Sequence, residues 1–179
     1  MNAHTEKRLS GRTVFRGKII DVVHDTVELE NGRQTTREVV RHRGAVAILA
    51  YDGPKLVLVR QYRYAVGAEL LEIPAGKLEE NEQPLAAAFR ELSEETGGFC
   101  TDLEPLGDYY GSPGILGEHI SLFFGHLSGE GSQHPDEDEF LSVVRLLPDQ
   151  LREKIAAGEI ADGKTLAAFA LAQEKGLLD

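Results

Sequence analysis

The sequence has little cysteine and no long apolar run. Its one cysteine, Cys100, cannot form a disulfide within the chain, and this suits a reducing cytoplasm. We expect Cys100 to act as a small buried hydrophobic residue. No apolar run approaches the roughly 20 residues needed to span a bilayer, and the polar start MNAHTEKRLSGR lacks the apolar centre of a secretory signal. We therefore expect a cytoplasmic protein that does not enter the membrane.

Basic residues are also scarce. Lys and Arg number 19 against 30 Asp and Glu, which leaves a formal net charge of -11. This balance argues against a nucleic-acid-binding surface, because phosphate backbones are bound by basic patches. An acidic protein can still bind a phosphorylated small molecule if divalent metal ions lie between the two sets of negative charges. Such a site requires carboxylates that are concentrated in one place.

The composition is that of an ordinary globular domain. Hydrophobic residues make up 41% and charged residues 27% of 179 residues, enough for one fold with a substantial core. We expect a loose tail over residues 1–11, then strands from residue 13 with a hairpin turn at Asn31-Gly32. Further strands are expected at 45–51, 55–62, 69–73, 104–110, 119–126 and 140–146. Helices are expected at 83–96, 148–157 and 164–174. This order predicts an α/β sandwich with a mixed sheet.

The helix expected at 83–96 has a cluster of carboxylates. Glu94 and Glu95 follow Glu91 by three and four residues, so the three carboxylates lie on or near one helical face. Like charges at this spacing repel, and a hard divalent cation with oxygen ligands is their natural partner. Arg90 is four residues from Glu94 and can pair with it. The alternative is an acidic face that is simply solvated.

The loop before this helix decides between the two interpretations. Gly76, Glu82, Arg90, Glu91, Glu94, Glu95 and Gly97 stand at the spacing G-x5-E-x7-R-E-x-x-E-E-x-G. This pattern resembles the signature of the Nudix hydrolase family. It departs at Gly98, where an aliphatic residue is usual, and we expect Phe99 to supply the missing packing. The resemblance implies a Nudix-type α/β/α sandwich and hydrolysis of a pyrophosphate.

The resemblance also implies which residues do the chemistry. Glu91, Glu94 and Glu95, with the Ala75 carbonyl, are the implied ligands of Mg²⁺ or Mn²⁺, and Arg90 and Glu95 count as catalytic. Gly76 and Glu82 shape the loop. Metal ions neutralise pyrophosphate oxygens and make a bound water a competent nucleophile near neutral pH.

Segments outside the signature resemble the ADP-ribose pyrophosphatase group. They are residues 36–40, 44–47, 59–63, 72–79, 110–114 and 136–140. In that group the N-terminal strands cross to a second subunit, so the resemblance implies a homodimer. Residues 1–43 would be the dimerisation region, exchanged between subunits, and 44–179 the Nudix hydrolase domain.

The same resemblance implies the substrate-binding residues. Arg37 and Glu38 would recognise the adenosine, and Arg63 the phosphates, because an arginine fork suits paired oxygens. Gly114 and Glu118 would also line the substrate site, with Glu118 at the terminal ribose or a metal. A glutamate in the acidic run 136–139 would act as general base. We prefer Glu137, with Glu139 next. The alternatives are a strand-end surface residue for Arg63, a plain turn for Pro113 and a solvated loop for the acidic run.

The leading hypothesis is Mg²⁺-dependent hydrolysis of ADP-ribose to AMP and ribose 5-phosphate. A second hypothesis is hydrolysis of another nucleoside diphosphate sugar, such as GDP-mannose. A third is a catalytically silent domain that only binds a nucleotide sugar. The complete set Glu91, Glu94 and Glu95 argues against the third, because a binding domain has no need of a metal site.

Overall fold

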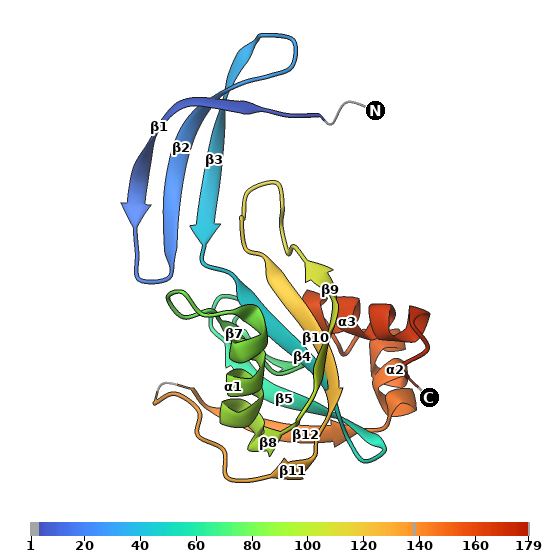
Figure 1. The fold of residues 1–179 in the computed structure, drawn as a ribbon. Helices are drawn as coiled ribbons and strands as arrows, with labels where there is room; N and C mark the ends of the chain where they lie inside the picture. Colours follow the sequence, from blue (N-terminus) through green and yellow to red (C-terminus); the bar gives the residue numbers. More distant parts are fainter. Residues whose placement is uncertain (1–3, 138, 179) are drawn as a thin grey trace. The chain divides into compact units, whose positions relative to one another are not determined.

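The chain divides into two compact units. Figure 1 shows the computed structural model, which describes residues 4–137 and 139–178. The N-terminal unit comprises the residues up to Gly44 together with Tyr110–His119, and the C-terminal unit comprises Ala45–Tyr109 and the chain from Ile120 onward. The boundary expected between residues 43 and 44, and the dimerisation role of the first part, stay predictions. No helix among the described residues is long and apolar enough to cross a membrane.

The N-terminal unit is built on a three-stranded antiparallel sheet. Its strands lie in the order β1 (Lys7–Arg16), β2 (Ile20–Glu28) and β3 (Gln34–His42). The loose tail expected over residues 1–11 is wrong from Lys7 onward, because Lys7 pairs with Glu28 and the ladder continues to Arg16. The first part of β1, residues 7–12, is exposed and lacks the apolar alternation that predicts a strand. The expected turn at Asn31-Gly32 is present, with Gly32 at φ 78°.

The C-terminal unit contains a mixed sheet. Its main path is β12 (Leu141–Leu146), β5 (Lys55–Arg63), β4 (Ala45–Asp52), β10 (Ile120–His126) and β9 (Leu103–Tyr109). Strand β6 (Ala68–Glu72) pairs with β5, and the short β7 (Ala75–Lys77) pairs with β4. Strand β10 is parallel to β4, whereas the other pairs in this sheet are antiparallel. A separate ladder joins β8 (Gly98–Phe99) to β11 (Gly129–Glu130).

Helices cover both faces of this sheet. Helix α1 (Pro84–Thr96) lies on one face, and α2 (Pro148–Ala156) and α3 (Gly163–Glu174) lie on the other (Figure 1). Alternation along β4 explains the layers, because Ile48 packs with the α1 residues Ala88 and Leu92, whereas Leu49 packs with the α2–α3 layer. The expected α/β/α sandwich with a mixed sheet is confirmed.

Two glycines end helix α1. Gly97 adopts φ 71° and donates its N–H to the Ser93 carbonyl, a left-handed C-cap that favours glycine. At Gly98, a Cβ atom would lie 2.8 Å from a methyl carbon of Leu127. Leu127 therefore fills the space beside Gly98. The expectation that Phe99 does so is wrong, since 51% of Phe99 is exposed.

Candidate functional site

Strand β7 brings the signature loop against helix α1. Gly76 pairs with Val46 in the sheet, and the Ala75 N–H donates to Oε2 of Glu95 at 3.0 Å. A Cβ atom on residue 76 would lie 1.9 Å from the carboxyl carbon of Glu91. Only glycine therefore allows the Glu91 carboxylate to lie against this strand, which gives the signature glycine a steric reason.

Arg90 holds the remaining carboxylates of the signature. Its Nε and Nη2 donate to the two oxygens of Glu82 at 2.9 and 2.8 Å, which ties the helix to the loop before it. Its Nη1 donates to Glu91 and to Glu94, both at 2.8 Å. The pairing of Arg90 with Glu94 expected from their spacing is present. Arg90 therefore orients acidic side chains through its forked geometry.

Two of these carboxylates are buried close together. Glu95 is 1% exposed and Glu91 8%. Burial raises the pKa of Glu95 to about 8, and the negative charges of Glu91 and Glu139 add to the effect. Burial also raises the pKa of Glu91, against the opposing influence of Arg90. Neighbouring buried carboxylates with raised pKa values indicate a place where positive charge is needed.

The oxygen atoms available in this cluster are of the type that hard divalent cations bind. Glu91 and Glu95 supply carboxylate oxygens beside the backbone of β7, and such oxygens are what Mg²⁺ and Mn²⁺ prefer. No three acidic, His or Cys side chains in the described part of the chain already converge on one point. Glu91 and Glu94 direct oxygens to Arg90 instead. Glu91 and Glu95 are therefore the principal candidate ligands, with Glu94 held nearby by Arg90.

Arg63 is the candidate phosphate ligand in the C-terminal unit. It ends β5, and its Nε and Nη2 donate to the two oxygens of Glu72, both at 2.7 Å. The hydrogen bonds to Glu72 raise the pKa of Arg63, and the charge of Glu95 contributes to the same shift. Arg63 thus lies within electrostatic reach of the buried glutamates. Its side chain is 35% exposed, so it is not a plain surface residue.

The acidic run offers one residue near the cluster. Glu139 is half-buried, and its negative charge raises the pKa of both Glu91 and Glu95. Glu137 is exposed, and Asp138 lies outside the described residues. Glu139, the second choice from the sequence, is thus within electrostatic reach of the glutamates, and which of Glu137 and Glu139 serves the site stays a prediction. Register within a run of adjacent acids could not be read from the sequence.

The other expected substrate residues belong to the N-terminal unit. Arg37 on β3 donates to Glu6 at 3.0 Å from its Nε, and Glu118 lies 3.4 Å from Nδ1 of His42. Glu38 pairs with His24 in the sheet, and space is open around Gly114. The structure brings Arg63 and the signature glutamates together within one unit and places these four residues in the other. Their part in substrate binding stays a prediction.

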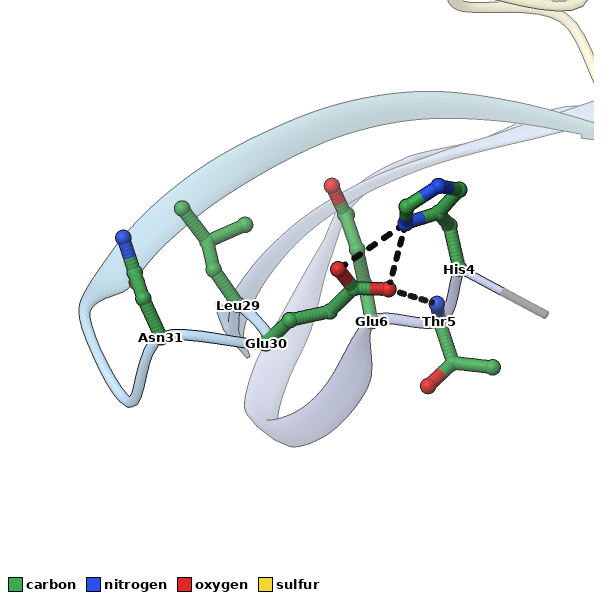
Figure 2. Close-up of a pocket in the computed structure, with 6 residues that line it drawn as sticks. All are labelled: His4, Thr5, Glu6, Leu29, Glu30 and Asn31. Atoms are coloured by element: carbon green, nitrogen blue, oxygen red, sulfur yellow. Dashed lines mark hydrogen bonds and ion pairs between the residues drawn. The ribbon is translucent and has the colours of Figure 1, made fainter. Parts of the chain in front are cut away.

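A hollow of about 490 Å³ also lies in the N-terminal unit. Figure 2 shows its lining, with Glu30 reaching both the ring of His4, at 2.9 Å, and the Thr5 N–H, at 3.0 Å. The lining residues are His4, Thr5, Glu6, Leu29, Glu30 and Asn31. They include two glutamates and neither Lys nor Arg, which does not suit an anionic phosphate. The glutamates of the C-terminal unit are therefore the stronger candidates for the chemistry.

Family models match nearly the whole chain. Residues 40–169 match the NUDIX domain, and residues 6–40 match the nucleoside diphosphate sugar hydrolase N-terminal domain. The chain is 38% identical to the ADP-ribose pyrophosphatase of Bacillus subtilis, over 99% of this chain and 98% of that one. It is 41% identical to the methanol dehydrogenase activator of Bacillus methanolicus, over 91% and 90%.

Two more distant proteins are also similar over most of the chain. A GDP-mannose pyrophosphatase of Escherichia coli is 34% identical, over 79% of this chain and 83% of that one. The crystal structure of an ADP compounds hydrolase superposes with a TM-score of 0.83, over 98% of this chain and 97% of that one. At 24% identity this last likeness concerns the fold alone.

Proposed function

The chain belongs to the Nudix family, and we propose that it hydrolyses the pyrophosphate of ADP-ribose to AMP and ribose 5-phosphate. The observation that carries the proposal is the pair of buried glutamates, Glu91 and Glu95, against β7, where Gly76 leaves room for Glu91 and the Ala75 N–H donates to Glu95. The names of the ADP-ribose pyrophosphatases among the relatives support the choice of sugar. Nudix hydrolases depend on divalent metal ions, and we propose Mg²⁺, with Mn²⁺ as a substitute.

Five residues of the C-terminal unit have distinct tasks in this proposal. The metal, when bound, neutralises pyrophosphate oxygens and lowers the pKa of the attacking water. Glu91 and Glu95 hold it, while Arg90 keeps Glu91 and Glu94 oriented. Arg63 binds phosphate oxygens, and Glu139 accepts the proton that the attacking water loses. The water oxygen bonds to one phosphorus as the bond from that phosphorus to the bridging oxygen breaks.

We also propose a homodimer in a cytoplasmic setting. Strand β1 is the edge of its sheet and is exposed along its whole length. Leu9, Val14 and Phe15 are large apolar residues on this strand that remain exposed. An exposed edge of this kind is a template for pairing with another chain. Arg37, Glu38, Gly114 and Glu118 would then recognise the nucleoside and the terminal ribose.

Two alternatives differ in what the protein does with the ligand. Hydrolysis of GDP-mannose is supported by the GDP-mannose pyrophosphatases among the relatives. A silent nucleotide-sugar-binding domain is the other. The intact carboxylates Glu91, Glu94 and Glu95 and their support by Arg90 and Ala75 argue for turnover.

A substrate panel with product analysis tests the proposal. Purified protein with Mg²⁺ is given ADP-ribose, GDP-mannose and other nucleoside diphosphate sugars in separate reactions. We expect ADP-ribose to have the highest kcat/KM and to yield AMP and ribose 5-phosphate. Hydrolysis in ¹⁸O-labelled water then identifies the phosphorus attacked, because the label stays on that product. Rapid turnover of GDP-mannose with ADP-ribose untouched would reject the choice of sugar, and binding without turnover of any substrate would support the silent domain.

A further inference from the structure

The C-terminal unit contains a buried set of charges beside the glutamate cluster. We call Glu72, Lys164, Asp162 and Thr165 the Glu72 network. Glu72 is 1% exposed, Lys164 8% and Thr165 0%. Burying a carboxylate and an ammonium is costly unless both are paired and hydrogen-bonded. None of the roles assigned above explains why the fold maintains these charges.

The network runs without a break from helix α3 to Glu72. Asp162 caps α3, accepting from the Thr165 N–H at 2.9 Å and from its hydroxyl at 2.6 Å. The other Asp162 oxygen accepts from Nζ of Lys164 at 3.0 Å. Lys164 also donates to Oε2 of Glu72. The first residues of α3 thereby fix the position of the Glu72 carboxylate.

The network continues from Glu72 into the proposed site. Both Glu72 oxygens accept from the guanidinium of Arg63, so the fork is held in one plane. The Thr165 hydroxyl also accepts from the Ile73 N–H at 2.9 Å, directly before the loop that supplies Ala75. Hydrogen bonds therefore connect helix α3 to Arg63, the proposed phosphate-binding residue, and to Ile73, which precedes the segment that contacts Glu95. A chain of charged hydrogen bonds of this kind restricts its members more than any single pair would.

We propose that Lys164, acting through Glu72, is a positioning residue for Arg63. The inference rests on the proposed function insofar as Arg63 binds the pyrophosphate. With Lys164 present, the charges of Arg63 and Lys164 balance those of Glu72 and Asp162, and the Glu72 carboxylate that orients Arg63 is fixed from α3. Without Lys164, the remaining three groups would carry a net negative charge, and Glu72 would keep Arg63 as its one charged partner in the network, so that α3 would no longer fix the position of the guanidinium.

A double-mutant cycle between Lys164 and Arg63 tests this inference. The variants are Lys164→Met, Arg63→Ala and the double substitution, assayed on the nucleoside diphosphate sugar that the wild type turns over fastest. We expect Lys164→Met to raise KM about tenfold and to change kcat about twofold or less, because binding that is equally strong in the ground state and the transition state appears in KM. In the Arg63→Ala background, Lys164→Met should change KM about twofold or less.

Two further variants separate positioning from a general loss of structure. Lys164→Arg retains a cation that can reach Glu72, and it should restore KM to within about threefold of the wild type. Glu69→Gln removes the exposed partner of Arg60 on the same strands, β5 and β6, and should leave KM unchanged. If Lys164→Met does not fold, Asp162→Asn replaces it, because asparagine still caps α3 but no longer pairs with Lys164 as a charge. Asp162→Asn should raise KM about threefold when Arg63 is present and should leave KM unchanged in the Arg63→Ala variant.

The outcomes distinguish this inference from the proposed function. Equal KM effects of Lys164→Met with and without Arg63 would overturn it, as would a fall in kcat with unchanged KM. A substrate other than ADP-ribose would correct the proposed sugar and leave the cycle intact, since the cycle uses whichever pyrophosphate is cleaved. If the wild type binds ADP-ribose without hydrolysing it, the Kd of ADP-ribose replaces KM in the same double-mutant cycle.

Discussion

Removing the charge of Glu95 should stabilise the metal-free protein and abolish catalysis. The substitution is Glu95→Gln, which retains an oxygen that can accept from the Ala75 N–H. In the wild type, burial raises the pKa of Glu95 from 4.5 to about 8. A raised carboxyl pKa contributes stability below pH 4.5 that is lost as the pH rises through about 8. Glutamine cannot ionise, so the variant should keep this stability.

The size of the effect follows from the shift. At 1.36 kcal/mol per pKa unit, the wild type should be less stable than the variant by about 4 kcal/mol at pH 8 and by about 1 kcal/mol at pH 5. The difference between the two proteins should therefore grow by about 3 kcal/mol over this range. Metal binding should make the wild type the more stable of the two proteins, because a cation compensates the charge of Glu95 and binds the neutral amide of glutamine more weakly.

Urea denaturation followed by circular dichroism provides the measurement. Both proteins are unfolded with EDTA at pH 5, 6.5 and 8, and the free energies of unfolding are compared. Glu104→Gln, at an exposed position of β9, is the matched control and should run parallel to the wild type. Parallel curves for wild type and Glu95→Gln across this range would refute the argument that Glu95 is buried against its own charge. Mg²⁺ that stabilises both proteins equally would refute its role as a ligand.

The remaining predictions concern the loop, the base, the metal and the dimer. Gly76→Ala should lower kcat about 100-fold or more with a folded protein by circular dichroism, because its Cβ would lie 1.9 Å from the Glu91 carboxyl carbon. Glu139→Gln should lower kcat about 100-fold, more than Glu137→Gln does, and the reverse order would restore the preference drawn from the sequence. EDTA should abolish activity and Mg²⁺ restore it; activity that survives EDTA would contradict the metal site. Phe15→Lys on β1 should halve the mass seen by sedimentation equilibrium at micromolar concentration, and a monomeric wild type would reject the dimer.

The sequence predicted the chemistry of the site better than its geometry. The signature predicted which glutamates lie together, because spacing along a helix fixes the face that they share. It could not show that Glu91 depends on the missing Cβ of Gly76, since that contact joins a strand to a helix. Glu72 and Lys164 were not identified either. They are far apart in the chain, and an isolated Lys in a helix start has no pattern that distinguishes it from a solvated one.

The fold shows the same division. Apolar runs predicted β4, β5 and β10, which are buried along most of their length. Pro84 in the first turn and the glycines after Thr96 predicted the bounds of α1. The sequence missed residues 7–12 of β1, which are all exposed and form a strand only through pairing with β2. It also missed β7, β8 and β11, which have three residues or fewer and carry no readable period. These elements are defined by their neighbours rather than by their own composition.

The short strand β7 sets different limits on change in the two segments that flank it. Its register, with Gly76 opposite Val46, decides which residue faces Glu91. One residue inserted between Ile73 and Gly76 would place a side chain where the Glu91 carboxylate now lies, and Glu91 could no longer lie against β7. Insertions after Lys77, in the turn that leads to α1, would leave this register alone but would move Glu82 away from Arg90, which now ties the turn to the helix. Neither segment can therefore change its length freely: a steric contact fixes the first, and an ion pair fixes the second.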